Sequence, residues 1–393
     1  MKTEKWKFET PSYIFDTDIL AQQIGKLRKA FGNGVKLCYA MKANPFVIKE
    51  LEGLVDSFEV CSPGEFSICE RAGIKAEQTV LSGVYKSEKD MEYVMGRYGN
   101  KPAYTVESLS QWQLLKACAQ KYRTPVSALL RLTSGNQFGM NGELIRRLVR
   151  ETDQKWISIE GLQYYSGTQK KSAEKLDKEI SGLEDFCREL KEEEGFAVKI
   201  IEYGPGLPIP YFEGDAYEPD SLLEFLAKRI KHMNFNGSLT LEMGRFIAAP
   251  CGFYVTAVAD TKINNGVSYC ILDGGIHHLN YYGQTLAMKK PPVLHLGSHD
   301  GPEKEWTVCG CLCTAGDVLI KQYPFKNLQP GDQLVFLKTG AYSMTEGISL
   351  FLSRDLPSVF LHSSEKGFIR MRNSFPTNIL NSNTKETTPW NNY

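Results

Sequence analysis

The chain has 393 residues, which is long for a single hydrophobic core, so two domains are expected. It carries 46 basic and 46 acidic residues, and this zero formal net charge argues against nucleic acid or a membrane surface as partner. No apolar run is long enough to cross a membrane. The charged first residues are not followed by the apolar segment that a signal peptide needs, so we expect none. The ten cysteines have no framework spacing, which favours reduced thiols and a cytoplasmic protein.

Strand-like and helix-like segments alternate along the first two thirds of the chain. Eight segments have the apolar character of buried strands: Val35–Ala40, Phe58–Cys61, Thr79–Leu81, Ala103–Val106, Ala128–Leu132, Ile157–Tyr165, Val198–Tyr203 and Ser238–Glu242. Helical periodicity lies between them, as in Pro63–Ala72, Leu109–Tyr122, Gly142–Glu151, Ala173–Glu194 and Ser221–Met233. This α/β alternation predicts a parallel sheet, and eight strands are the number in a TIM barrel. An open doubly wound sheet is the alternative, because it needs only the alternation.

The pattern changes after Arg245, where long helical segments cease and short β-like runs predict an all-β domain. These runs are Phe253–Val258, Val267–Leu272, Val293–Leu296, Trp306–Val308, Leu334–Leu337 and Phe368–Met371. A further strand, Thr10–Asp16, could join them. We therefore predict a TIM barrel over residues 27–246. We also predict a mainly C-terminal all-β domain, a β-barrel or sandwich, formed by residues 1–26 and 247–375. Residues 376–393 are rich in Asn, Thr and Ser and are expected to form a flexible tail.

A lysine follows the first expected barrel strand directly, in the run Tyr39-Ala40-Met41-Lys42-Ala43-Asn44. Its amine would lie at the mouth of the barrel, and the small residues beside it leave room for a ring to approach. Lysine in such a place can form a Schiff base, which is the chemistry of pyridoxal phosphate. A solvated lysine that closes a strand is the alternative for Lys42 taken alone.

Other residues suited to chemistry also follow expected strands, and the C-terminal strand ends are where a TIM barrel carries its site. They are Glu59, Cys61, Ser62, Arg131, Tyr165, Ser166, Gly167, Gly204, Pro205, Gly206, Glu242, Gly244 and Arg245. The glycine turn after the seventh strand could direct backbone N–H groups at a phosphate. Glu242 and Arg245 would also fit an ordinary salt bridge at a strand end.

These motifs resemble those of the fold-type III (alanine-racemase-like) pyridoxal-phosphate-dependent decarboxylases, the family of the diaminopimelate, ornithine and arginine enzymes. The resemblance runs from about Thr10 to Leu361. Tyr39–Asn44 is similar to the family's Y-A-x-K-A-N, and Phe58–Glu65 to its F-D-x-x-S-x-x-E. Gly204–Gly206 takes the place of its Gly-Gly-Gly phosphate loop, and Glu242–Arg245 resembles its E-P-G-R.

The resemblance implies a role for each barrel residue. Lys42 would hold pyridoxal phosphate as a Schiff base, and Glu242 would pair with the ring nitrogen, which keeps the ring an electron sink. The remaining expected cofactor contacts are Glu59, Arg131, Tyr165, Gly204, Gly206, Gly244 and Arg245. Tyr165 stands where the family often has a stacking histidine, and Glu59 stands where it has aspartate.

The β domain resembles the family as well. Val308–Asp317 is similar to G-P-x-C-E/D-S/G-x-D, which implies that Cys313 protonates the carbanion left after CO2 departs. Gly340-Ala341-Tyr342 resembles G-A-Y, whose tyrosine reaches the phosphate. In the family both loops come from the partner subunit, so a homodimer with shared active sites is expected.

Two patterns in this domain also suggest metal ligands. Cys309, Cys311 and Cys313 alternate, so they would face one side of a strand, and a zinc site is an alternative to buried and functional thiols. His277 and His278 lie in a segment similar to the family's D-A/G-G, where adjacent strand side chains would point to opposite faces. This segment could bind a metal or could form a loop that lines the substrate pocket. Both interpretations remain open, and we assign no metal.

The expected substrate residues are Thr314, Asp317 and Tyr282. Thr314 replaces the acid that in the family takes the distal amine of the substrate, and the segment before Tyr282 is short and lacks an R-P step. A pocket without that acid would bind a free diamino acid poorly, because the ammonium would be left unpaired. This favours a modified or carrier-tethered amino acid, as in the butirosin-type branch that acts on acyl-carrier-linked residues.

We therefore expect a decarboxylase of an α-amino acid, free or linked to a carrier protein. A racemase of the same fold is the alternative enzyme, although Cys313 in its motif favours decarboxylation. A non-catalytic binding or regulatory protein is the alternative of a different class. The joint presence of Lys42, Glu242, Arg245 and Cys313 argues against it.

Overall fold

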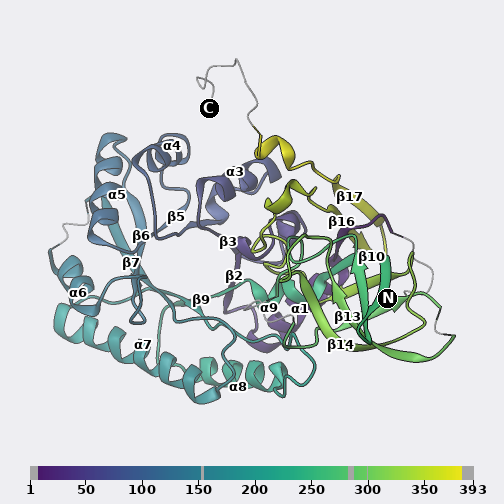
Figure 1. The fold of residues 1–393 in the computed structure, drawn as a ribbon. Coiled ribbons are helices and arrows are strands. Elements are labelled where there is room, and N and C mark those ends of the chain that lie inside the picture. Colours follow the sequence, from purple (N-terminus) through teal and green to yellow (C-terminus); the bar gives the residue numbers. More distant parts are fainter. Residues whose placement is uncertain (1–7, 152–154, 282–286, 299, 383–393) are drawn as a thin grey trace. The chain divides into compact units, whose positions relative to one another are not determined.

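The computed structural model describes residues 8–151, 155–281, 287–298 and 300–382 (Figure 1). The described residues divide into two compact units. One unit comprises residues 19–210 and 216–248, and the other contains the remaining described residues. The sequence placed the boundaries at 26/27 and 246/247, whereas the units divide at 18/19 and 248/249, and residues 211–215 lie with the second unit.

The first unit is a closed barrel of parallel strands in chain order (Figure 1). The strands are β2 (Lys36–Ala40), β3 (Ser57–Val60), β4 (Thr79–Leu81), β5 (Ala103–Val106), β6 (Val126–Leu132), β7 (Ile157–Tyr165), β8 (Ile200–Gly204) and β9 (Ser238–Met243). The last strand pairs with the first, with Leu241 opposite Leu37. This closure confirms the TIM barrel and excludes the open sheet.

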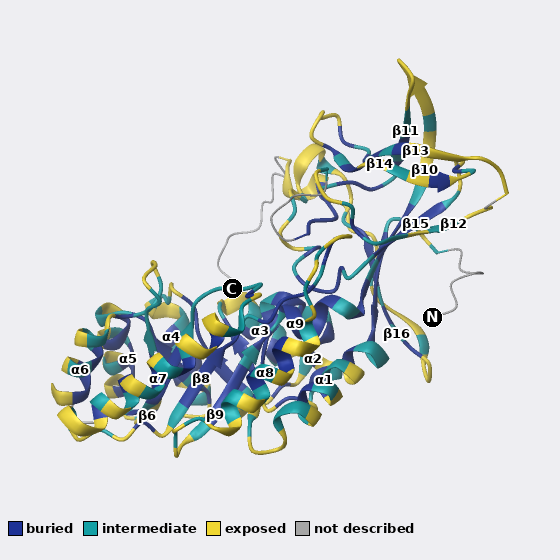
Figure 2. Cartoon of the chain, turned by 90° about the horizontal axis from the view of Figure 1, so that it is seen from below, coloured by how far each residue is buried: buried dark blue, intermediate teal, exposed yellow. Residues whose placement is uncertain are grey.

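Helices surround the strands, with buried residues toward the sheet and exposed residues outward (Figure 2). They are α1 (Thr17–Phe31), α2 (Ile48–Leu51), α3 (Pro63–Ala72), α4 (Glu88–Tyr98), α5 (Leu109–Lys121), α6 (Gly142–Glu151), α7 (Ala173–Glu194), α8 (Pro219–Lys231) and α9 (Arg245–Ala248). Serine begins four of them, because Ser62, Ser87, Ser108 and Ser172 each accept a hydrogen bond from a first-turn backbone N–H. None of the helices in the described ranges is long and apolar enough to cross a membrane.

The second unit is built on a nine-stranded sheet. Its strands are β1 (Ser12–Asp16), β10 (Gly252–Asn264), β11 (Val267–Leu272), β12 (Val293–Leu296), β13 (Glu303–Cys309), β14 (Val318–Lys326), β15 (Gln333–Leu337), β16 (Ser358–Ser363) and β17 (Gly367–Arg372). The N-terminal strand β1 joins this sheet, as the sequence suggested, and it lies between β10 and β16. Ile14, Val255 and Val335 pack together in its core. Of the expected tail, Asn378–Leu380 form a short 3-10 helix, and residues 383–393 lie outside the described ranges.

Gly161 shows how closely two barrel strands approach. A Cβ atom added there, on β7, would lie 1.8 Å from the carbonyl oxygen of Ile200 on β8. We expect Gly161→Ala to lower the free energy of unfolding by about 1–3 kcal/mol, the range typical of overpacking, as measured by urea unfolding. The control is Gly182→Ala on α7, where nothing lies within 4 Å and alanine should stabilise the helix by up to about 1 kcal/mol. Equal effects of the two changes would contradict this packing.

Candidate active site

Lys42 lies in a 3-10 turn (η1, Met41–Ala43) directly after β2. Its neighbours Met41 and Ala43 are buried, whereas 39% of the Lys42 side chain is exposed. The turn is anchored on both sides, because the Tyr39 hydroxyl donates to the carbonyl oxygen of Asn44 at 3.2 Å. The amine therefore projects from a fixed backbone at the C-terminal rim of the barrel.

Two glutamates from the neighbouring strands flank this amine. Lys42 Nζ donates to Glu59 Oε2 on β3 and lies 3.9 Å from Glu242 Oε1 on β9. It also lies 3.5 Å from Cys61 Sγ. The strand register explains the convergence, because Ala40 pairs with Glu59 and Cys38 pairs with Glu242 on the two sides of β2.

The two glutamates differ in how readily they lose a proton. Burial alone would raise the pKa of Glu59, but the charge and hydrogen bond of Lys42 hold that pKa below its usual value. Burial and the neighbouring Glu59 carboxylate raise the pKa of Glu242 well above its usual value. Glu59 is therefore the carboxyl that ionises first beside Lys42, and Glu242 holds its proton more tightly.

Glycines shape the rim beyond β8. Gly204 packs against the ring of Tyr165, because an added Cβ would lie 2.6 Å from Tyr165 Cδ2. Gly206 has φ +60°, and its Cβ would lie 2.1 Å from the carbonyl oxygen of Gly167. The loops after β7 and β8 thus meet through bare backbone, which suits an anion. Gly244 after β9 makes a similar close approach, because its Cβ would lie 2.9 Å from that of Ala43.

The two arginines expected at this rim have different surroundings. Arg245 is buried, and its Nε donates to Thr168 Oγ1 at 3.3 Å, which places a guanidinium beside the glycine turns. Arg131 at the end of β6 pairs with the buried Glu107 at 2.8 Å. Its guanidinium also lies 4.9 Å from the ring centroid of Phe138.

The sequence did not lead us to three polar residues that lie near the rim or inside the barrel. Lys86, in the loop after β4, donates to the carbonyl oxygen of Gly83 at 2.8 Å, and burial lowers its pKa to about 8. Gln163 on β7 and Glu202 on β8 are buried inside the barrel, 2.7 Å apart. The available signal was a polar residue in the middle of an apolar strand, or a charged residue shortly after one.

In the second unit Asp317 organises the loop that carries Cys313. The Asp317 carboxylate is buried and accepts hydrogen bonds from the backbone N–H of Ile276 at 2.9 Å and of Leu312 at 2.8 Å. Strand β13 ends at Cys309, and the chain turns around this carboxylate before β14 begins. The expectation that three alternating cysteines share one strand face is therefore wrong.

The other expected residues of this unit lie in turns as well. Cys313 and Thr314 are exposed, and Tyr342 is half-buried with φ +65°. His277 and His278 do not point to opposite faces, since they lie in a turn after β11 with ring centroids 3.8 Å apart. Burial lowers their pKa values to about 3 and about 4. Tyr282 lies outside the described residues.

Comparison with known proteins identifies the family. A family model described as pyridoxal-dependent decarboxylase, pyridoxal binding domain, matches residues 17–249. The chain belongs to this family. The expected family, decarboxylase class and cofactor are thereby confirmed. The rim fits pyridoxal phosphate, because it combines a projecting lysine, a buried carboxyl with a raised pKa and glycine turns that an added Cβ would fill.

Individual relatives align over nearly the whole chain. L-glutamyl-[BtrI acyl-carrier protein] decarboxylase of Niallia circulans is 24% identical, over 89% of this chain and 88% of its own length. Diaminopimelate decarboxylase of Aquifex aeolicus is 25% identical, over 94% and 90%. The crystal structure of diaminopimelate decarboxylase from M. jannaschii in complex with L-lysine superposes with a TM-score of 0.82 at 21% identity, covering 93% of this chain and 90% of the other. The two proteins therefore share their fold.

The opposite pKa shifts of the two glutamates give opposite effects on stability. Because the pKa of Glu59 is lowered by folding, its ionisation stabilises the protein above pH 4.5 and this stabilisation is lost in acid. We expect Glu59→Gln to lower the free energy of unfolding of the ligand-free protein at pH 8 by about 1–2 kcal/mol, because Lys42 is partly solvated. Glu242→Gln should instead raise it, because ionising Glu242 opposes folding.

Urea unfolding at several pH values checks both signs. The difference for Glu242→Gln should shrink as the pH falls toward 4.5, whereas the difference for Glu59→Gln should shrink only at lower pH, as Glu59 takes up its proton in the folded protein. A loss of stability in both variants at pH 8 would contradict the opposite pKa shifts of Glu59 and Glu242.

Proposed function

We propose that this chain decarboxylates a modified or carrier-tethered α-amino acid at the rim around Lys42. The observation that carries this proposal is the position of Lys42 between Glu59, whose pKa is lowered, and Glu242, whose pKa is raised, at the mouth of a barrel whose glycine turns suit a phosphate. Family membership supports the reaction class, and the substrate is inferred from residues particular to this chain.

Each residue of the rim has a distinct task in this reaction. When bound, pyridoxal phosphate supplies a ring that accepts the electron pair left on the α-carbon as CO2 departs. Lys42 holds the cofactor through Nζ, and Glu242 holds a proton on its carboxyl for the ring nitrogen. The turns at Gly204, Gly206 and Gly244, with Arg245, would hold the phosphate.

Tyr165 and Arg131 complete the proposed cofactor site. Tyr165 presents an aromatic face beside Gly204, and burial together with the nearby Glu242 raises its pKa, so it stays neutral. Arg131 is held in place by the buried Glu107. Both side chains are therefore positioned before any ligand arrives.

Cys313 is the proposed proton donor to the α-carbon after CO2 leaves. Its thiol is exposed on a loop that Asp317 fixes through two backbone N–H groups, so the position of the thiol is set without the thiol being buried. We assign Asp317 this positioning task, and Thr314 contact with the substrate. Tyr342, which is half-buried in a loop whose neighbouring residues are buried, would reach the phosphate.

We further propose a homodimer in which Cys313 and Tyr342 act in the partner's site. The second unit exposes an apolar patch on two segments held side by side, because Leu356 and Phe375 form a backbone bridge and Asn381 Nδ2 donates to the carbonyl oxygen of Leu350 at 2.7 Å. The exposed apolar residues of the patch are Ile348, Leu350, Phe351, Leu352, Phe375, Ile379 and Leu380. Such a contiguous patch is typical of a protein interface.

The substrate proposal rests on Thr314. Its hydroxyl already accepts the backbone N–H of Gly316 at 3.4 Å and carries no charge to pair with a distal ammonium. The relative from Niallia circulans acts on a glutamyl group carried by a protein, which is a substrate of the proposed class. The racemase and the non-catalytic alternatives gain no support, because the matched family is one of decarboxylases.

The first test concerns the cofactor lysine. Borohydride reduction of the pyridoxal-phosphate-loaded protein, followed by peptide mapping, should place the pyridoxyl mass on Lys42, and Lys42→Ala should abolish CO2 release. Lys36→Ala is the matched control, because Lys36 begins the same strand and lies at the other end of the barrel. A label on another lysine would overturn the site assignment.

The second test concerns the shared site. Lys42→Ala and Cys313→Ala proteins, each nearly inactive, should together regain about a quarter of wild-type activity after random subunit exchange, since half of the dimers are mixed and each has one intact site of two. CO2 release measures the recovery. No recovery despite exchange shown by mass-tagged subunits would mean that Cys313 does not act across the interface.

The third test concerns Thr314. We expect kcat/KM for free lysine, ornithine and diaminopimelate to lie below about 10⁴ M⁻¹s⁻¹. Thr314→Glu should raise the preference for a basic amino acid over the native substrate by about tenfold, because it adds a charge-assisted contact. Thr314→Gln, which has nearly the same shape without the charge, should not. Efficient turnover of a free diamino acid by the wild type would contradict the tethered-substrate proposal.

A further inference from the structure

A second glutamate is buried behind Glu242, and the reaction described above does not use it. Glu202 on β8 is 2% exposed, and Gln163 Nε2 on β7 donates to its Oε1 at 2.7 Å. The same nitrogen lies 3.3 Å from Glu242 Oε2 on β9 and 3.2 Å from Ser82 Oγ. One amide group therefore connects two carboxyls on neighbouring strands of the barrel.

The charges around Glu202 disfavour its ionisation. It faces Glu242 on β9, Glu59 on β3 and the Cys38 thiol on β2. The cations nearby are Lys42, Arg131, which is already paired with Glu107, and Lys36, which lines the same cavity as Glu202. Three buried carboxyls cannot all be ionised next to so few cations. Burial raises the pKa of Glu202 to about 7, so it exchanges its proton near neutral pH.

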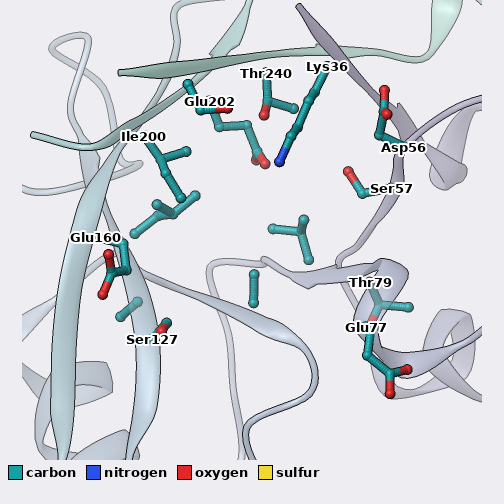
Figure 3. Close-up of a pocket in the computed structure, with 15 residues that line it drawn as sticks. Lys36, Asp56, Ser57, Glu77, Thr79, Ser127, Glu160, Ile200, Glu202 and Thr240 are labelled. Carbon is teal, nitrogen blue, oxygen red and sulfur yellow. The ribbon is translucent and has the colours of Figure 1, made fainter. Parts of the chain in front are cut away.

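Glu202 also lines a cavity of about 350 Å³ at the opposite end of the barrel from Lys42 (Figure 3). The cavity is lined by the first residues of several strands, among them Lys36, Ser57, Thr79 and Ser238. Its lining mixes apolar side chains with charged and hydroxyl groups, and it has room for several water molecules.

The other carboxyls at this cavity are paired outward, with Asp56 on Arg28 at 2.8 Å, Glu77 on Lys101 at 3.3 Å and Glu160 on Lys199 at 3.0 Å. Glu202 instead has the Gln163 amide as its partner in the described part of the chain. It is therefore the carboxyl of this cavity that is directed inward, toward Glu242.

We propose that Glu202 is a positioning residue that keeps a proton inside the barrel, so that Glu242 can ionise opposite the cofactor ring without a second anion behind it. Glu202 exchanges that proton with water in the cavity at the N-terminal mouth, on the side of the barrel away from the substrate. Gln163 couples the two carboxyls. This inference rests on the proposed function, which places the cofactor ring opposite Glu242. It adds to that function the group that sets the charge behind Glu242.

The test uses holoenzyme in which borohydride has fixed the pyridoxyl group on Lys42, so that fluorescence reports the surroundings of the ring without turnover. The wild type should show a fluorescence transition near pH 7. Glu202→Gln should remove the transition, and Glu160→Gln, at the same cavity but paired with Lys199, should retain it. A transition that persists in Glu202→Gln, or disappears in Glu160→Gln, would overturn the proposal.

A second variant guards against failure of Glu202→Gln to fold. Gln163→Leu keeps Glu202 and removes a hydrogen bond that lowers its pKa. The transition should therefore move to higher pH in Gln163→Leu. An unchanged midpoint would show that the amide does not couple to Glu202.

A third measurement does not depend on the cofactor. Folding raises the pKa of Glu202, so this group lowers the free energy of unfolding as the pH rises from 4.5 to about 7. Above pH 7 the loss stays constant. The Tm of ligand-free Glu202→Gln relative to wild type should rise between pH 5 and pH 8.5. Glu160→Gln should leave the difference nearly unchanged between pH 5 and pH 8.5, because folding lowers the pKa of Glu160 and its effect on stability therefore changes below this range.

The outcomes separate the two proposals. If the pyridoxyl label is absent from Lys42, the proposed function fails, and the Tm difference still reports on Glu202. If Lys42 is labelled and the Tm difference of Glu202→Gln is independent of pH, the role of Glu202 is overturned and the proposed function stands.

Discussion

The ion pair between Lys42 and Glu59 sets the protonation of the whole barrel interior. It forms because β2 lies between β3 and β9, and parallel strands bring the residues at their ends to one rim. Only the lysine end reaches solvent, so the Glu59 carboxylate stays ionised in a buried position through this one cation. Glu242 on the other side must then keep its proton, because two adjacent carboxylates cannot both be ionised beside one amine. The same constraint passes through Gln163 to Glu202.

Space at the rim depends on glycine rather than on charge. Gly204, Gly206 and Gly244 each occupy a point where two backbone segments meet, or where a loop packs on an aromatic ring, and a methyl group at any of them would collide. The positive φ of Gly206 adds a second reason for glycine there. The result is a rim of close-packed backbone without side chains at these positions, next to the projecting lysine. The charged groups of the site thus come from Lys42 and the glutamates, whereas the room for a ligand comes from the glycines.

Much of the barrel could be predicted from the sequence, because its strands are short apolar runs and serine marks where several helices begin. The bounds expected for Thr79–Leu81, Ala103–Val106 and Ile157–Tyr165 are those of β4, β5 and β7. Strand β14 was not expected, since Pro324 and several polar residues interrupt its apolar pattern. The motif around Lys42 indicated the family, which the family model confirmed.

What could not be predicted depends on contacts between distant residues. The turn after Cys309 exists because the carboxylate of Asp317 accepts two backbone N–H groups, one of them from the loop at Ile276. Gln163 and Glu202 lie 39 positions apart and become neighbours only when the barrel closes. Lys86 belongs to no motif, and its place near the rim follows from the loop after β4.

The most direct test of this account is an infrared titration of the carboxyl groups in the ligand-free protein. The account predicts a C=O band, assigned to Glu242, that persists to higher pH than the bands of exposed carboxyls. The band should disappear in Glu242→Gln, and also in Glu59→Gln, because Glu242 then ionises as the partner of Lys42, whereas Glu202→Gln should keep it. Absence of the band in the wild type, or its survival in Glu242→Gln, would contradict the account.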